Sequence, residues 1–125
     1  MVFNPQNLIK KEGSFIIEKE VCAVAHTCLD TTVIKEFWDG FTYASSKISF
    51  EKTNELVFEV GTAARVALDG NEYAINVEKG GFSVVGESKE ALIRGVMTLL
   101  DRFVPIEIDG ESRAELPCFS LAERP

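Results

Sequence analysis

The clearest pattern of hydrophobic and polar positions lies between residues 73 and 103. Apolar residues alternate with small or polar ones over 73–77 and again over 82–86. This period of two predicts two strands, the first of them with one buried face. Lys79-Gly80-Gly81 separates the two runs and predicts a tight turn, because glycine accepts positive φ without steric cost. The segment therefore begins as a β-hairpin.

The same segment continues as an amphipathic helix. Ser88 carries an oxygen that can cap the first turn, and Pro105 marks the end. The apolar residues between them are spaced as one helical stripe. They are Leu92, Ile93, Val96, Leu99, Leu100 and Phe103. The polar residues Glu90, Arg94 and Asp101 are expected on the face toward water.

A second amphipathic helix is predicted after residue 30. Asp30-Thr31-Thr32 offers capping oxygens, and apolar residues follow at i, i+1, i+4, i+5 and i+8. These residues are Val33, Ile34, Phe37, Trp38 and Phe41. Lys35, Glu36 and Asp39 lie on the opposite face. Gly40 falls within the pattern and weakens the last turn by up to about 1 kcal/mol relative to alanine.

Shorter apolar runs predict the remaining strands. Ser14–Glu18 and Val21–His26 are rich in apolar and β-branched residues, which indicates two strands or one long bent strand. Lys47–Glu51 and Glu55–Val60 are two further strand candidates. Residues 52–54 between them have the composition of a turn.

Three stretches show no clear pattern of a helix or a strand. Residues 1–13 are interpreted as a lead-in to the first strand. Gly61–Gly70 is compatible with a helix or an extended segment, and Asp69-Gly70-Asn71 ends it as a turn. No helix or strand is assigned beyond Pro105.

Together these elements predict an α+β fold in a single domain spanning residues 1–125. Two helices, each with one apolar stripe, must cover an apolar surface, and the strands supply it. We therefore expect a mixed, mostly antiparallel sheet with both amphipathic helices packed on one face. A chain of 125 residues can bury roughly two-thirds of its unfolded surface, which is enough for a core.

Composition and charge restrict the classes of partner. The formal net charge of −7 argues against binding nucleic acid or an anionic membrane through bulk electrostatics. No apolar run approaches the roughly 20 residues that cross a bilayer. The first six residues lack a basic segment followed by an apolar one, so no signal peptide is predicted there. The compartment and the oligomeric state stay open.

The cysteines and the single histidine do not form a recognisable site. Cys22, Cys28 and Cys118 are too few and too irregularly spaced for a disulfide framework or a zinc site. Cys22 and Cys28 are interpreted as small buried hydrophobic residues, although a Cys22–Cys118 pair is geometrically possible. His26 has no second histidine to complete a metal site and is interpreted as a hydrogen-bonded residue at a strand end.

A search for catalytic motifs gives none. The sequence has no Gly-x-Ser-x-Gly elbow, no phosphate-binding loop and no adjacent Asp-Glu pair. Its acidic residues are scattered over predicted turns and solvent faces. Trp38 and Phe41 could stack on a sugar ring, but their helical spacing favours a place in the core. We therefore predict no catalytic, cofactor-binding or metal-binding residue.

Three sets of residues in the 73–103 segment match a known pattern. The strands and the helix contribute Glu72, Tyr73, Ile75 and Val77, then Gly81, Phe82 and Val84, then Ala91, Leu92, Gly95, Thr98 and Leu99. In this pattern the segment resembles the small non-catalytic domain that precedes the catalytic barrel of family 20 glycoside hydrolases, the β-N-acetylhexosaminidases. One departure is Ala91, where the family helix carries its first glycine.

Both ends of the chain add to the resemblance. Pro5-Gln6 followed by Gly13-Ser14-Phe15 is similar to the opening of the family domain. Residues 121–125, Leu-Ala-Glu-Arg-Pro, resemble the Ile-x-Asp-x-Pro link into the barrel, with Glu123 in place of aspartate. The resemblance is therefore spread over nearly the whole chain, although about thirty residues carry the motif itself.

The resemblance implies an accessory domain of a carbohydrate-active hydrolase whose partner is a catalytic barrel in the same parent protein. In the family an adjacent Asp-Glu pair on that barrel performs the chemistry, so no catalytic residue carries over to this chain. Related domains precede the barrels of α-glucuronidases and O-GlcNAc hydrolases, which leaves the substrate class open. A free-standing α+β binding or regulatory module is the alternative, and a small enzyme is a third possibility.

Overall fold

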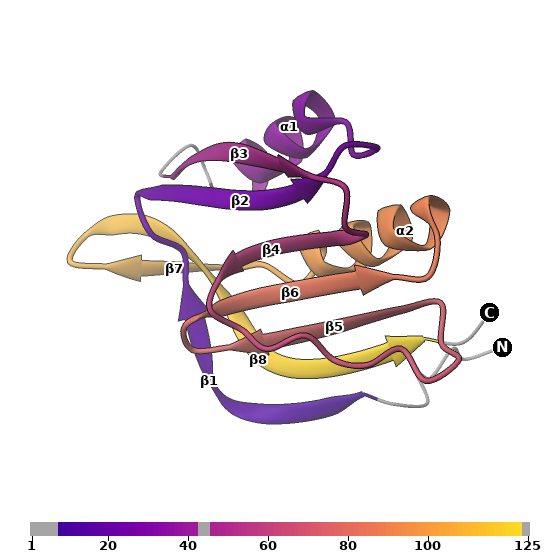
Figure 1. Cartoon of the computed structure of the whole chain (residues 1–125). Helices are drawn as coiled ribbons and strands as arrows, with labels where there is room; N and C mark the ends of the chain where they lie inside the picture. Colours follow the sequence, from indigo (N-terminus) through magenta and orange to yellow (C-terminus); the bar gives the residue numbers. More distant parts are fainter. Residues whose placement is uncertain (1–7, 43–45, 124–125) are drawn as a thin grey trace, which may run out of the picture.

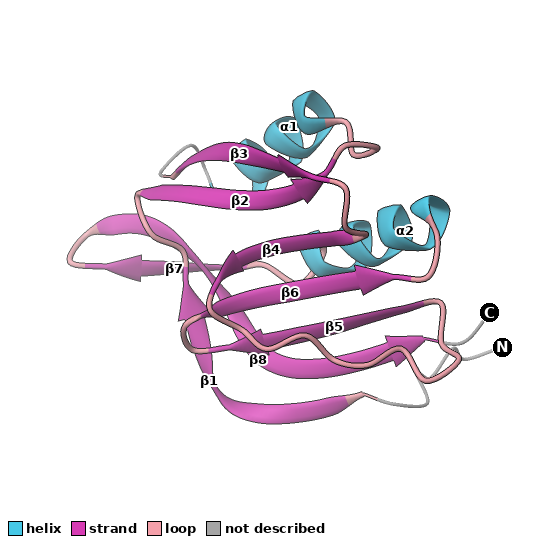
Figure 2. Cartoon of the chain, in the orientation of Figure 1, coloured by secondary structure: helices cyan, strands magenta, loops and turns pink. Residues whose placement is uncertain are grey.

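The computed structural model describes residues 8–42 and 46–123 as one eight-stranded sheet with two helices (Figures 1 and 2). The strands are β1 (Ile9–Ile16), β2 (Glu20–His26), β3 (Lys47–Thr53), β4 (Val57–Gly61), β5 (Tyr73–Glu78), β6 (Gly81–Gly86), β7 (Val104–Ile108) and β8 (Glu111–Glu123). The helices are α1 (Thr31–Thr42) and α2 (Lys89–Leu100). Pro5-Gln6 and Arg124-Pro125, which enter the family resemblance, lie outside the described residues.

The strand order is β1-β8-β5-β6-β4-β2-β3, and β7 pairs with the first part of β8. Every pairing is antiparallel except that of β2 with β3, which are parallel and joined through α1. A parallel pair needs such a crossover because the chain must return to the same end of the sheet. The predicted α+β class and the mixed, mostly antiparallel sheet are confirmed.

The C-terminal strands are the largest element missing from the sequence-based prediction. β7 and β8 form a hairpin through Asp109-Gly110, both at positive φ, and β8 then continues beside β1 and β5. The sequence of β8 does not predict a strand, because its first residues are largely charged and Pro117 interrupts the apolar residues that follow. Pro117 lies at a change of register between β1 and β8, where the regular ladder is already broken.

The first strand is also longer than predicted. β1 begins at Ile9, inside the stretch interpreted as a lead-in, and its register shifts between Lys10 and Ser14. Gly13 allows this irregularity, because its φ of 90° is one that other residues rarely adopt. The side chain of Lys79 fills the space beside it, so a Cβ at Gly13 would lie 2.4 Å from Lys79 Cε.

Both predicted helix caps are confirmed. Asp30 Oδ1 accepts hydrogen bonds from the backbone N–H groups of Thr32 and Val33 at 3.0 and 3.3 Å. Ser88 Oγ accepts one from Ala91 N at 3.1 Å. These oxygens satisfy donors that a helix leaves unpaired in its first turn. The sequence thus sets the start of each helix locally.

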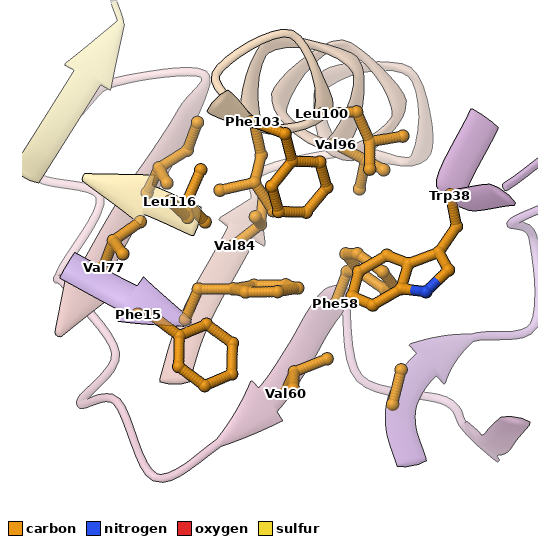
Figure 3. Close-up of a cluster of buried hydrophobic side chains, with 14 of the residues drawn as sticks. Phe15, Trp38, Phe58, Val60, Val77, Val84, Val96, Leu100, Phe103 and Leu116 are labelled. Carbon is orange, nitrogen blue, oxygen red and sulfur yellow. The ribbon is translucent and has the colours of Figure 1, made fainter. Parts of the chain in front are cut away.

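A single hydrophobic cluster joins both helices to the sheet (Figure 3). Trp38 of α1 is fully buried and meets Phe103 edge to face, with 5.3 Å between ring centroids. α2 packs on β5 and β6, whereas α1 contacts β3, β7, β8 and α2. That both helices cover one face of the sheet stays a prediction.

The apolar stripes of the helices are only partly buried. Val33 and Phe37 of α1 remain 40% and 39% exposed, and Ile93 of α2 is 43% exposed. All three belong to the predicted stripes, so the stripes are wider than the surface that the sheet covers. The helices therefore present apolar side chains to their surroundings.

The predicted half-buried strand β5 is instead buried on both faces. The segment between β4 and β5, which is neither helix nor strand over residues 62–72, crosses its second face (Figure 2). Ala64 N donates to Glu78 Oε2 at 2.7 Å, and Asn76 Nδ2 donates to Ala64 O at 2.9 Å. These bonds explain why polar residues alternate along β5 although the strand is central. Polar side chains fix the covering segment there.

Candidate functional site

His26 and the cysteines do not form a site in the structure. His26 is buried at the end of β2, and its Nδ1 accepts a hydrogen bond from Cys28 N at 2.9 Å. This confirms its interpretation as a hydrogen-bonded strand-end residue. All three cysteines are free thiols. Cys118 is buried, and this burial raises the pKa of its thiol.

The burial predicted for Cys22 is wrong, because its side chain is exposed. β2 alternates between a core face, which carries Val21 and Ala23, and an outer face, which carries Cys22. Cys28 follows the strand and is partly buried. Within residues 8–42 and 46–123 no three His, Cys, Asp or Glu side chains are grouped so that they could hold a metal ion.

The aromatic residues of α1 divide between core and surface. Trp38 is fully buried, as its spacing predicts, and Phe41 is partly buried. Phe37 stacks on Phe41 with 6.3 Å between ring centroids and an interplanar angle of 13°. A shallow depression of about 390 Å³ lies beside this pair, lined by Glu36, Phe37, Gly40 and Phe41.

The residues of the family pattern meet at the end of the sheet where β8 stops. The hydroxyl of Tyr73 on β5 donates a hydrogen bond to Glu123 Oε2 and lies 3.0 Å from Thr98 Oγ1 on α2. Glu72 N donates to Glu123 O at 2.7 Å, so the backbone of the last strand is also fixed. Three segments separated along the chain are thus joined through one buried phenol.

Gly95 makes this arrangement possible. A Cβ at this position would lie 2.9 Å from Val84 Cγ1 and 3.0 Å from Tyr73 Cδ1. Contacts this short are avoided between carbon atoms, so only glycine lets α2 approach the ring of Tyr73 so closely. Gly86 has the same role one strand away, because its Cβ would lie 2.6 Å from Leu92 N. Gly95 of the pattern and Gly86 outside it therefore mark helix–sheet contacts, whereas Gly81 of the pattern lies against the backbone of β4, where its Cβ would lie 2.0 Å from Val60 O.

The electrostatics of the cluster keep the phenol neutral. Burial raises the pKa of Tyr73 to about 12, and the neighbouring carboxylate of Glu123 adds to the rise. Tyr73 is therefore a hydrogen-bond donor at neutral pH and cannot serve as a base. Glu72 accepts a 2.6 Å bond from Arg94 Nη2, so both carboxylates here are already acceptors in internal bonds. The cluster holds elements together and supplies no free acid–base pair.

A depression of about 660 Å³ opens above this cluster. Its lining residues are Glu72, Tyr73, Ile93, Arg94, Met97, Thr98, Arg102, Leu121 and Glu123. Ile93 and Met97 are the apolar side chains that α2 contributes to this lining, and Arg94 and Arg102 contribute positive charge. Ile93 belongs to the predicted buried stripe of α2 but is 43% exposed, so the spacing of the apolar residues does not predict this surface. Its signal was the width of the stripe, which exceeds the face that one sheet can cover.

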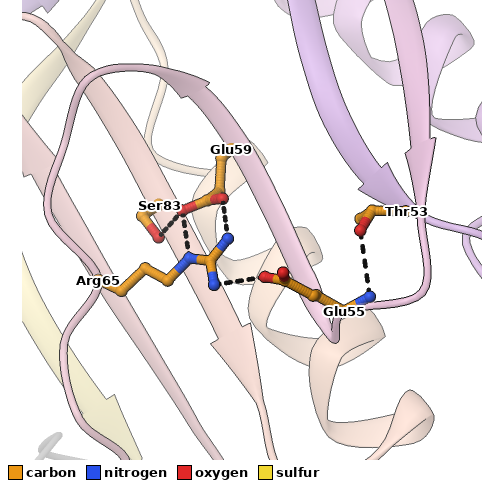
Figure 4. Close-up of polar contacts among 5 residues, drawn as sticks. All are labelled: Thr53, Glu55, Glu59, Arg65 and Ser83. Carbon is orange, nitrogen blue, oxygen red and sulfur yellow. Dashed lines mark hydrogen bonds and ion pairs between the residues drawn. The ribbon is translucent and has the colours of Figure 1, made fainter.

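A second polar network lies on the other side of the sheet (Figure 4). Arg65, in the segment that covers β5, donates two hydrogen bonds to Glu59 of β4 at 3.0 and 2.8 Å and pairs with Glu55 at 2.5 Å. Ser83 of β6 donates to the same Glu59 at 2.9 Å. Burial by itself would raise the pKa of Glu59, but the bonds from Arg65 and Ser83 outweigh it and lower that pKa. The network fastens the covering segment.

Comparison of the chain with protein-family models, with curated proteins and with solved structures gives no match. Among the residues that the structure describes, neither helix has the length and apolar character needed to cross a bilayer.

Proposed function

We propose that this chain is the accessory, non-catalytic domain of a carbohydrate-active glycoside hydrolase similar to the family 20 β-N-acetylhexosaminidases. The observation that carries the proposal is the meeting of pattern residues from three separate segments. Gly95 and Thr98 from the helix and Glu123 from the link all lie against Tyr73 of the strand. A chance match of composition would not require these residues to meet.

The position of Glu123 supports a role in fixing a following domain. Its carboxylate accepts a hydrogen bond from Tyr73 of β5 and its backbone carbonyl accepts one from Glu72 N, so the last residue of β8 is fixed against the sheet. Ile93 and Met97 of α2 line the same depression as Glu123. In the proposal, a catalytic barrel that follows the link would pack against these apolar side chains.

The exposed side chains of the helices are the expected contact area. Val33, Phe37 and Ile93 are each exposed by about two-fifths, which is unusual for residues in helical stripes. Exposed apolar side chains of this kind would become buried if another domain packed against the helices. In this proposal both helices cover one face of the sheet, supported by the contact of Trp38 with Phe103 in one common core. The barrel would then pack against the outer side of that helix layer.

Catalysis is assigned to the partner. The acidic side chains of the Tyr73 cluster are engaged in internal bonds, and the chain has no adjacent Asp-Glu pair. In the proposal such a pair on the barrel supplies the general acid and orients the acetamido group of the substrate. This domain would contribute stability and positioning of the barrel.

The coding sequence beyond Pro125 tests the proposal. We expect an Arg-Gly soon after Pro125 and an adjacent Asp-Glu pair well downstream. A stop codon directly after Pro125 would refute it and favour the free-standing binding module. A longer protein without such a pair would refute the hexosaminidase assignment.

A further inference from the structure

Three strands have one unpaired edge within the described part of the chain, namely β1, β7 and β3. An open edge exposes N–H and C=O groups that can pair with another strand. β1 is interrupted by its register shift at Lys10/Ser14, and Pro105 removes a donor from β7. β3 has neither a bulge nor a proline over its seven residues. It is the edge that remains competent for pairing.

The alternation of β3 determines which of its backbone groups face outward. Lys47 N donates to Lys19 O at 2.8 Å, and Thr53 O accepts from Thr27 N at 3.0 Å, so both residues direct their backbone groups toward β2 and its flanks. Because backbone groups alternate along a strand, Ile48, Phe50 and Lys52 direct theirs toward the open edge. These three residues would form the hydrogen-bonded positions of any added strand.

We propose that β3 pairs with β3 of a second copy of this chain, antiparallel and about a two-fold axis at Ser49. In this register Ile48 and Phe50 of opposite copies form hydrogen-bonded pairs. Lys47 of each copy then lies opposite Glu51 of the other, on the face where both side chains are exposed. The dimer would contain two such Lys–Glu pairs, related by symmetry.

Charge complementarity selects this register. Moving the axis to Phe50 keeps the backbone pairing possible but places Glu51 opposite Ser49 and Lys47 opposite Thr53, so the ion pairs are lost. Cross-strand pairs of opposite charge stabilise a sheet, and like charges directly opposite destabilise it. The charged residues of β3 therefore favour the axis at Ser49 over the axis at Phe50. Each copy carries a net charge of −7, which opposes association, so we expect a weak, reversible dimer.

Disulfide cross-linking tests the register. In a background with Cys22→Ser and Cys28→Ser, S49C should give a linked dimer, because Cα atoms of a non-hydrogen-bonded antiparallel pair are about 4.5 Å apart. K47C alone should not link, since its two copies would be about 13 Å apart. A mixture of K47C with E51C should link. The proposal is wrong if S49C links no better than K47C.

A charge exchange tests the same dimer without cysteines. K47E should weaken association, measured by sedimentation equilibrium, about tenfold or more, because two attractive pairs become repulsive. The exchange K47E/E51K should restore the native affinity. Circular dichroism should show native spectra for all variants, since both side chains are exposed. A chain that stays monomeric at every concentration, or a K47E chain that dimerises as well as the native one, would overturn the proposal.

This interface is independent of the proposed barrel contact. Its groups belong to β3, whereas the barrel would contact the helices. Cross-linking of the 125-residue chain can therefore fail while the coding sequence still encodes a barrel. Cross-linking can also succeed when no barrel is encoded, so the two proposals are tested separately.

Discussion

The side chains at the two ends of the sheet differ in how many contacts they make within the chain. The difference separates residues that hold the fold together from residues that could contact a partner. At the β5–β6–α2 end, Tyr73, Thr98 and Glu123 bind one another, and Gly95 admits the helix against the ring. At the β2–α1–β3 end, Phe37 stays exposed, and Trp38 Nε1 is buried without a hydrogen-bond partner in the described part of the chain. The first end carries the residues of the resemblance, and its only strongly exposed apolar side chain in the described part of the chain is Ile93 on α2, whereas α1 at the second end exposes both Val33 and Phe37.

Under the proposed function, a motif can mark the family of a domain without forming its contact surface. The residues that carry the resemblance include some with very tight internal contacts, such as Gly95 against the ring of Tyr73. Residues that meet a partner show no such constraint within the chain. They appear only as apolar side chains that the domain itself does not bury.

The largest effect on stability is expected at the β5–β6–α2 end, where α2 packs most tightly against the sheet. Gly95→Val should lower the free energy of unfolding by about 3 kcal/mol, because the added carbons would overlap Val84 and Tyr73. Chemical denaturation measures this. Gly40→Val on α1 is the matched control, since no atom lies within 4 Å of a Cβ there. Equal losses for the two glycines would contradict the contrast between the ends.

The buried phenol gives the next effect. Tyr73→Phe should cost about 1 to 2 kcal/mol at neutral pH, because Glu123 loses a buried donor. Since the folded chain raises the pKa of Tyr73 from 10.0 to about 12, this group stabilises the fold fully below pH 10. That contribution is lost as the pH rises from 10 toward 12. The free energy of unfolding, measured between pH 10 and pH 12, should fall less steeply with pH for Tyr73→Phe than for the native chain. Equal slopes for the two proteins would exclude the assigned hydrogen bond.

A smaller effect is expected on the opposite face of the sheet. Arg65→Gln should cost about 0.5 to 1 kcal/mol near neutral pH, because solvent screens this half-exposed ion pair. The native chain lowers the pKa of Glu59 from 4.5, so its stabilisation is present above pH 4.5 and is lost as the pH falls through the folded value. The variant should lose stability less steeply on acidification. Denaturation between pH 6 and pH 3 compares the two slopes.

The smallest effect belongs to the exposed aromatic side chain. Phe37→Ser should change the stability of the 125-residue chain by no more than about 0.5 kcal/mol, because the residue is 39% exposed and its printed ring contact is the stacking on Phe41, which is itself only partly buried. Thermal unfolding measures this. In a longer protein that contains the barrel, the same variant should lower the unfolding temperature. A large loss in the short chain would mean that Phe37 belongs to the core.

Local patterns predicted the elements whose signals are local. The caps at Asp30 and Ser88, the hairpin at Gly80-Gly81 and the burial of Trp38 follow from spacing and residue type. The long strand β8 did not, because its burial depends on β1 and β5, which are far away in the sequence. A strand that is defined by pairing with distant segments need not show a regular alternation of apolar and polar residues. The charged, proline-containing run of β8 shows none.

The site was predictable to a lesser degree. The pattern named Tyr73, Gly95, Thr98 and Glu123, but the bond between the first and the last joins residues fifty positions apart. Nothing in their spacing indicates it. The exposure of Ile93 and Cys22 likewise depends on which neighbours the sheet provides, and a stripe or an alternation alone does not specify its covering partner.

The central claim is that this domain supports chemistry performed by residues that it does not contain. Release of nitrophenol from a nitrophenyl N-acetyl-β-hexosaminide, measured with the purified 125 residues and with the complete coding product, tests it most directly. We predict release by the complete product and none above the buffer rate by the 125 residues. Release by the 125 residues that scales with their concentration would contradict the account.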